Sequence, residues 1–363
     1  MIAGTKMQPV RFAISYTVRN ESRILPSAIR YHLAAGCSRI YLYWDGTSDG
    51  SEQLVTGYPE VIARNSIHPS EIEDPPEWLA KILTCWEIDM DVRKIANTYH
   101  AARDAAIEGI DWLGSIDPDE LILMGRNEEI EGDHILKHLR RVGDDIDQLL
   151  LLNLESVPSS AESKCPFSDC VHFLNRLPAT EFLWRYSRAA LIRISRSPKL
   201  IAWYDYFFYQ VRLLGALPRL MREPNSGSVI PAGYFLGYSS YKSMIRTKSF
   251  TNFNFATHFW KRYLRAPRTL RLGNVLHFDM LDATYFSAKF RQRMFGERDS
   301  IFYLRYRLGL IARNYSESEI REFFQAYIAI NDPARIAMLK KKGILLEIDA
   351  VSKLMKKVSK EPC

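Results

Sequence analysis

Residues 111–124 read DWLGSIDPDELILM, and this stretch decides the fold. An apolar segment ends in three carboxylates, Asp117, Asp119 and Glu120, and apolar residues resume at once. The residue before Pro118 is biased to extended geometry, and in an extended chain side chains two apart point the same way. We therefore expect Asp117 and Asp119 to face one site at the end of a buried strand.

Two converging carboxylates repel each other unless a cation or a network of donors joins them. Hard oxygen ligands favour magnesium or manganese, held together with substrate phosphates. The alternative is a solvated Asp-Pro-Asp-Glu turn that caps a following helix. The apolar residues on both sides of the turn favour the first interpretation, because they put the acids beside a core.

The surrounding sequence alternates between strand and helix patterns. Strands are expected at 10–18, 39–44, 60–65, 111–116 and 148–155, and helices at 23–36, 91–108 and 127–142. This alternation predicts an α/β fold with a mostly parallel sheet, flanked by helices, whose ligands bind at the carboxyl ends of the strands. Further strands are expected at 189–195, 240–246 and 274–279, before a helical, basic tail that begins near residue 284.

The 363 residues carry a formal net charge of +7 and a pI near 9.0, which favours an anionic partner without specifying one. Five cysteines with no zinc-binding spacing indicate a reducing cytosol. We find no apolar signal region and no run of 18 or more apolar residues, so we expect a cytoplasmic protein that is neither secreted nor membrane-spanning.

The segment DWLGSIDPDELI resembles the metal-binding segment of GT-A glycosyltransferases, in particular the family-2-like bacterial group related to family 92. Residues 17–51, TVRNESRILPSAIRYHLAAGCSRIYLYWDGTSDGS, resemble the opening unit of that group. YKSMIR at 241–246, THFW at 257–260 and VLHFD at 275–279, followed by FSAKF, resemble its later strands. The resemblance covers most of residues 10–290.

The resemblance implies a GT-A-like, Rossmann-like catalytic domain over residues 1–290 and a helical basic extension over 291–363. It assigns the nucleotide sugar mainly to residues 10–125 and the acceptor mainly to 150–290. Asp117 and Asp119 would hold a divalent metal, Mn²⁺ or Mg²⁺, against the diphosphate of a nucleotide sugar. The base and ribose would be lined by Thr17, Asn20, Glu21 and Asp45.

Four further residues have both a functional and a structural interpretation. His277 is a candidate metal or phosphate ligand, or else a core histidine. Lys94 opens a helix where its ammonium could reach the nucleotide, or else it is solvated. Lys242 and Arg246 lie four apart on one face of a strand, where they would contact phosphate or form a solvated basic face.

The expected reaction moves a sugar from a nucleotide-diphosphate sugar to a saccharide or lipid-linked acceptor, with metal dependence and inversion. Inversion needs a carboxylate base, for which Glu155, Glu181 and Asp205 are the candidates. The main alternative is a nucleotidyltransferase or another metal-dependent nucleotide-binding enzyme, although the first strand lacks a glycine-rich phosphate loop. A protein that binds acidic surfaces would leave the Asp117 cluster unexplained, and no nucleic-acid partner is expected.

The tail, residues 335–360, has apolar residues at alternating spacings of four and three, followed by lysines. As one helix it would form an apolar stripe through Ile344, Ile348, Val351, Met355 and Val358. Such a helix could lie on an anionic inner membrane leaflet, or it could pack the stripe on protein and leave its lysines in water.

Overall fold

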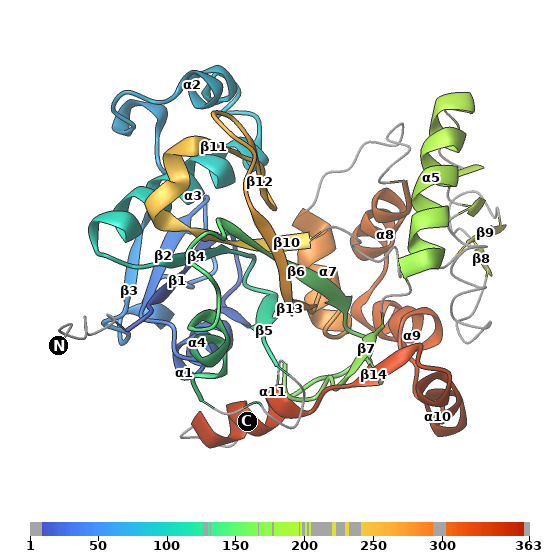
Figure 1. Cartoon of the computed structure of the whole chain (residues 1–363). Helices are drawn as coiled ribbons and strands as arrows, with labels where there is room; N and C mark the ends of the chain where they lie inside the picture. The colour runs from blue at the N-terminus through green and yellow to red at the C-terminus, as the bar shows by residue number, and fades with distance from the viewer. Residues whose placement is uncertain are drawn as a thin grey trace. The chain divides into compact units, whose positions relative to one another are not determined.

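The computed structural model describes residues 9–125, 130, 132–165, 167–175, 178–195, 197, 200–201, 203–204, 220–222, 229–231, 241–292 and 303–358. The chain divides into two compact units (Figure 1). The first unit comprises Met1–Asn153, Ser240–Leu276 and Lys353–Pro362. The second comprises Leu154–Ser239 and His277–Ser352, with Cys363.

The first unit is built on a sheet with the strand order β3-β2-β1-β4-β10-β6-β13-β5. Its strands are β1 Phe12–Val18, β2 Arg39–Trp44, β3 Val61–Asn65, β4 Trp112–Ser115, β5 Glu120–Leu123 and β10 Tyr241–Arg246, together with most of β6 Gln148–Glu155 and β13 Thr269–His277. Its helices are α1 Leu25–Ala34, α2 Glu77–Leu83, α3 Met90–Ile107 and α4 His134–Leu139. A hairpin of β11 Phe253–Phe255 and β12 Trp260–Arg262 and the short 3-10 turns η1 Gln53–Val55, η2 Pro69–Glu71 and η4 Thr247–Asn252 complete it.

The strands β3, β2, β1 and β4 are all parallel, whereas β10 is antiparallel to both of its neighbours. The register pairs Ser15 of β1 with Tyr41 of β2 and with Ser115 of β4. The carboxyl ends of β1, β2 and β4 therefore lie at one edge of the sheet. This confirms the predicted α/β fold and the predicted neighbourhood of these three strands.

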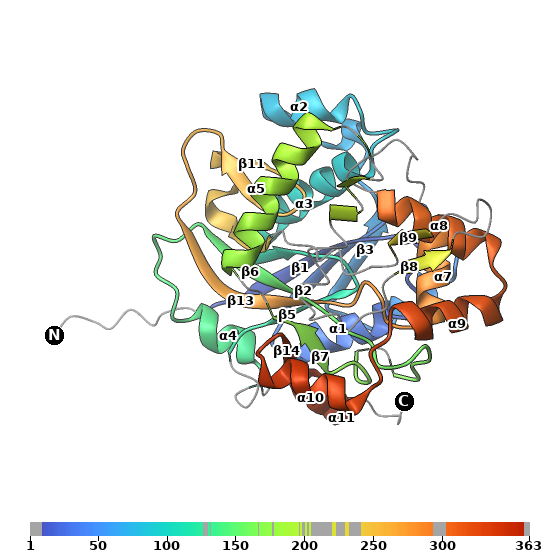
Figure 2. The ribbon, with the colours of Figure 1, turned by 90° about the vertical axis from the view of Figure 1, so that its right-hand side faces the viewer.

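The sheet has helices on both faces, and Figure 2 shows α3 on one side of β1 and β2 and α1 on the other. The α3 face is closed by small and aromatic residues, including Ala13, Leu113, Ala101 and Tyr43, all buried. Alanines at 96, 101, 102 and 105 let the helix backbone approach the strands closely. Each buried side chain of this kind contributes to stability roughly in proportion to its apolar area.

Two side chains of helix α1 form hydrogen bonds with the backbone of the edge strand β5. Tyr31 donates its hydroxyl proton to the carbonyl of Ile122 at 2.8 Å, and the amide of Ile122 donates to Nε2 of His32 at 3.3 Å. Burial lowers the pKa of His32 to about 3, so the imidazole is neutral and Nε2 can accept. His32 therefore has a structural role.

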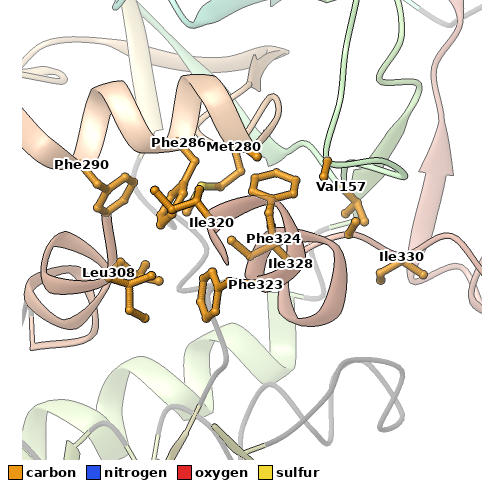
Figure 3. Close-up of a cluster of buried hydrophobic side chains, with 14 of the residues drawn as sticks. Val157, Met280, Phe286, Phe290, Leu308, Ile320, Phe323, Phe324, Ile328 and Ile330 are labelled. Atoms are coloured by element: carbon orange, nitrogen blue, oxygen red, sulfur yellow. The ribbon is translucent and has the colours of Figure 1, made fainter. Parts of the chain in front are cut away.

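The second unit contains a helical core. Its elements are β7 His172–Leu174, α5 Pro178–Ile194, β8 Leu220–Arg222, β9 Val229–Pro231, α7 Ala283–Gln292, α8 Tyr303–Asn314, α9 Glu317–Tyr327, α10 Pro333–Lys341 and β14 Leu345–Glu347. β14 pairs with β7, and β8 pairs with β9, both antiparallel. Figure 3 shows the buried cluster in which Phe286 of α7 faces Phe323 and Phe324 of α9. A capping box begins α9, since Ser316 and Glu319 bond each other's backbone amides.

Three predictions of local structure were wrong. Residues 189–195 belong to helix α5 and not to a strand, because their apolar residues continue a helical pattern that begins at Pro178. The helix expected at 127–142 is the shorter α4 in the described residues. The tail is not one helix from Ile344, because Gly343 adopts φ +67 and β14 follows it before α11 Ala350–Val358.

The apolar stripe of the tail is buried in protein. Ile344, Ile348, Val351 and Met355 are at most 7% exposed, whereas Lys353, Lys356 and Lys357 are exposed. The arrangement is the one expected of a packed helix with its lysines in water. Within the residues that the structure describes, no helix has the length and apolar character needed to cross a membrane.

Candidate functional site

The acidic turn links β4 to β5 at the carboxyl edge of the sheet. Glu120 is the first residue of β5, so the turn leads into a strand and caps no helix. The amide of Glu120 donates to the carbonyl of Asp117 at 3.0 Å, and the amide of Asp117 donates to Oε2 of Glu120 at 2.8 Å. Asp119 and Glu120 are buried, at 4% and 1% exposure. Two hydrogen bonds within the turn therefore fix its shape, and its carboxylates lie beside the core.

Two lysines bind the Asp117 carboxylate, one on each oxygen. Lys94 of α3 contacts Oδ1, and Nζ of Lys242 on β10 lies 2.9 Å from Oδ2. Nζ of Lys242 also lies 2.8 Å from Oε2 of Glu120. An ammonium group therefore joins Asp117 to Glu120. The expectation that Lys94 or Lys242 is solvated was wrong, since their side chains are 8% and 1% exposed.

The charges of this cluster stabilise one another. Burial alone would raise the pKa of Asp117, but Lys242 and Lys94 outweigh it and hold this pKa well below its usual range. Burial would lower the pKa of Lys242, but Asp117 and Glu120 together raise it. Asp117 is thus a carboxylate and Lys242 an ammonium ion over the whole physiological pH range.

The strand-end acid of β2 is paired with an arginine. Asp45 directly follows β2, and Nε and Nη2 of Arg93 contact its two oxygens at 2.5 and 3.1 Å. This hydrogen bond raises the pKa of Arg93. Arg93 and Lys94 are neighbours in the first turn of α3, so one helix end supplies a cation to Asp45 and another to Asp117.

Thr17 is fixed at the end of β1 by a buried amide. Nδ2 of Asn97 donates to Oγ1 of Thr17 at 3.0 Å and to Oγ of Ser66 at 3.1 Å, while Oδ1 accepts from the amide of Ile67 at 2.8 Å. One α3 side chain therefore ties the ends of β1 and β3 together.

The loop after β1 is fixed to the loop after β2. Asn20 adopts φ 56, a left-handed conformation that asparagine tolerates, and its side-chain oxygen accepts from the amide of Ser48 at 2.7 Å. Glu21 is half-buried, and its carbonyl accepts from Ile24 and Leu25 at the start of α1. The structure thus brings Thr17, Asn20, Glu21 and Asp45 to the same edge of the sheet.

Arg246 lies at the far end of β10 from Lys242. It pairs in register with Trp112 at the start of β4, and its guanidinium donates to the carbonyls of Ile146 and Gly143 at 2.7 and 2.9 Å. Its guanidinium carbon also lies 4.3 Å from the centroid of the Trp112 ring. The structure therefore does not bring Arg246 together with the acidic turn.

The second unit has its own buried polar cluster at the ends of β6 and β13. Nδ1 of His277 lies 2.8 Å from Oε1 of Glu155, and Nζ of Lys289 lies 2.5 Å from Oδ1 of Asp279. The ligand atoms of His277 and Asp279 lie within 4.8 Å of each other. A carboxylate on one imidazole nitrogen is the usual outer contact of a metal-binding histidine.

The structure describes the three candidates for the catalytic base to different extents. Glu155 is buried against His277. Glu181 belongs to α5, but its side chain is outside what the structure describes, and Asp205 lies outside the described residues altogether.

Sequence reasoning missed Arg93 and Asn97. The available signal was their position on α3, where Arg93, Asn97 and His100 recur at spacings of four and three and so share one face of the helix. Polar residues repeated on the face of a helix that packs on a sheet indicate specific partners, because buried polar groups need them.

No family model and no curated protein matches the chain. Solved structures of glucosyl-3-phosphoglycerate synthase from Mycobacterium tuberculosis are similar to it. The complex with phosphoglyceric acid is 12% identical with TM-score 0.28, over 68% of this chain and 60% of that chain. The complex with Mn²⁺, UDP and phosphoglyceric acid is 12% identical with TM-score 0.31, over 84% of this chain and 78% of that chain. The complex with Mn²⁺ and UDP-glucose is 13% identical with TM-score 0.32, over 83% of this chain and 79% of that chain. Neither identity nor TM-score is high enough to carry a residue's role from that enzyme to this chain.

Proposed function

We propose that the chain is a metal-dependent glycosyltransferase that takes a nucleotide-diphosphate sugar as donor. The observation that carries the proposal is the convergence of polar residues at the carboxyl ends of three neighbouring parallel strands. Thr17 ends β1, Asp45 follows β2, and the turn with Asp117 and Asp119 follows β4. This edge is where open α/β sheets bind nucleotides.

The cationic side chains at this edge support an anionic donor. Arg93, Lys94 and Lys242 belong to one unit and are all paired with strand-end or turn carboxylates. Fixed cations in a partly buried site favour the bound diphosphate and stabilise the negative charge that develops on it as the sugar leaves. In this role Lys94 binds and orients phosphate, while buried Lys242 holds the acidic turn, and Asp45 and Thr17 contact the nucleoside.

The proposed metal is Mn²⁺ or Mg²⁺, and the ligands named from the sequence are Asp117, Asp119 and His277. When bound, such an ion neutralises charge on the nucleoside diphosphate. The ligand atoms of this chain fit such an ion in part. Glu155 contacts the imidazole of His277, and carboxylate oxygen suits a hard cation. Asp117 fits less well, because each of its oxygens contacts an ammonium group.

The proposal also covers the acceptor and the stereochemistry of the transfer. We propose a saccharide or lipid-linked acceptor and an inverting transfer, with Glu155, Glu181 or Asp205 as the base. Contact with an anionic membrane would have to rest on the exposed tail lysines alone, since the apolar stripe beside them is buried. The division into a nucleotide-sugar part, an acceptor part and a C-terminal extension, and the cytoplasmic location, likewise stay proposals.

A nucleotidyltransferase is the second candidate, because it too would use strand-end acids and a metal. The loop after β1 contains no glycine between Val18 and Leu25, which does not favour a cradle for a triphosphate.

A thermal-shift screen of nucleoside diphosphates and nucleoside triphosphates, each with and without Mn²⁺, tests the proposal. We expect one nucleotide to stabilise the protein when Mn²⁺ is present and the same nucleotide to have little effect on Asp119→Asn. Exposed Asp144→Asn is the matched control and should behave as the wild type. Stabilisation by a nucleoside triphosphate alone would favour the second candidate.

A further inference from the structure

The Asp117 carboxylate is enclosed by groups of the protein itself. Lys94 reaches Oδ1 from the first turn of α3, and Lys242 reaches Oδ2 from β10 at 2.9 Å. The backbone amide of Asp117 donates to Oε2 of Glu120 at 2.8 Å. Three separate elements, α3, β10 and β5, thus fix this one residue.

The two lysines are not equivalent. Lys242 bridges Asp117 and Glu120 and is 1% exposed, so it belongs to the packed interior. Lys94 contacts the other oxygen, Oδ1, of Asp117, whose side chain is 34% exposed. Lys94 can therefore be removed without breaking the contact between Lys242 and Glu120.

A divalent ion on Asp117 would meet strong repulsion. It would have to share the carboxylate with two ammonium nitrogens, each already at contact distance from an oxygen. Like charges at such separations in a partly buried site oppose each other more strongly than in water. A cation could bind Asp117 only after at least one lysine had left.

We infer that Asp117 is a positioning residue that holds Lys94 and Lys242 and is withheld from the metal by them, so that cation binding on the turn depends on Asp119 and not on the aspartate pair. The inference rests on the proposed function for the presence of a divalent metal. It departs from the sequence interpretation, in which both aspartates hold the ion, and it makes Lys94 a residue that limits metal affinity.

The inference predicts a gain of metal binding. Lys94→Met releases one oxygen of Asp117 and leaves its charge, which adds a carboxylate ligand to the turn. We expect the Mn²⁺ affinity of this variant to rise about tenfold, because the charge and number of ligands tune divalent affinity over decades. The double variant Lys94→Met/Asp117→Asn should return to the wild-type affinity, since the added ligand is gone.

The experiment titrates Mn²⁺ into each purified full-length variant without nucleotide and follows free Mn²⁺ by electron paramagnetic resonance. Exposed Lys81→Met is the control for loss of a lysine charge, and circular dichroism checks the fold. Tighter binding in Lys94→Met, reversed in the double variant, with Asp117→Asn unchanged from wild type, supports the inference. Unchanged binding in Lys94→Met, or an Asp117→Asn defect as large as that of Asp119→Asn, overturns it. Because nucleotide is absent, failure of the proposed donor binding would be seen separately, in the thermal-shift screen.

Discussion

Replacing Lys242 by methionine should destabilise the first unit strongly. The ammonium group of Lys242 lies 2.8 Å from Oε2 of Glu120 and also contacts Oδ2 of Asp117. Lys242 and Glu120 are each 1% exposed. Water therefore cannot replace the lost contact, and Glu120 keeps a negative charge in a buried place.

The expected loss follows from this burial. Removing one partner of a buried ion pair leaves an uncompensated charge and costs about 3–5 kcal/mol of unfolding free energy. Replacing both partners removes that charge, so Lys242→Met/Glu120→Gln should recover about 0.5–3 kcal/mol relative to the sum of the single variants. Exposed Lys81→Met should stay within about 0.5 kcal/mol of the wild type.

Equilibrium unfolding in urea, followed by far-ultraviolet circular dichroism, measures these differences. The pairing of Lys242 with Glu120 predicts a large single-variant loss and a smaller loss in the double variant. A loss below about 1 kcal/mol for Lys242→Met, the ordinary effect of a point substitution, would refute the buried-pair reasoning.

The same cluster predicts a pH dependence. The folded-state pKa of Asp117 lies below its unfolded value of 3.8, so its contribution is present above pH 3.8 and is lost as the pH falls through the folded value. The pKa of Lys242 lies above its unfolded value of 10.5, so its contribution is full below pH 10.5 and is lost as the pH rises through the folded value. Urea unfolding of the wild type at a series of pH values should therefore show stability falling below the lower of these limits and above the upper one.

Three further predictions concern single contacts. Asn97→Ala leaves the buried amide of Ile67 without its 2.8 Å acceptor and should cost about 1–3 kcal/mol in urea unfolding, whereas Asn97→Asp, which keeps that acceptor oxygen, should lose less. Gly273→Ala should destabilise by about 1–3 kcal/mol, because φ is +82 and a Cβ would lie 2.9 Å from the carbonyl oxygen of Leu123, whereas Gly57→Ala, with nothing within 4 Å, should have little effect. Glu155→Ala should weaken Mn²⁺ binding about 10–100-fold if His277 is a ligand, and Glu155→Gln, which can still bond the imidazole, should weaken it less.

The neighbourhood of β1, β2 and β4 was predictable because it follows from local patterns. Apolar residues at 12–18, 39–44 and 112–115, separated by helical segments, leave few ways to build a sheet other than parallel neighbours. The end of helix α5 was not predictable as helix, because Ala189–Ser195 taken alone is a short apolar run that suits a strand or a helix.

The acids of the candidate site, and Lys94 and Lys242, were named from the sequence, but Arg93 and the pairing of acids with cations were not. Asp45, Asp117 and Asp119 follow strands directly, so their place at the carboxyl edge could be read from position alone. The partners of those acids come from a helix and from a strand more than a hundred residues later in the chain, and sequence spacing carries no information about such pairs. For the same reason the sequence did not show that lysines offset the charges of Asp117 and Glu120, since only the fold brings these residues close.

The central claim is best tested by the product released from candidate donors. The protein is incubated with Mn²⁺ and a panel of nucleotide-diphosphate sugars, and separately with nucleoside triphosphates and sugar phosphates, and the nucleotide products are separated by anion-exchange chromatography. The account predicts release of a nucleoside diphosphate from one sugar donor, dependent on Mn²⁺ and lost in Asp119→Ala but kept in Asp144→Ala. Release of pyrophosphate from a triphosphate, or diphosphate release that Asp119→Ala leaves unchanged, would contradict it.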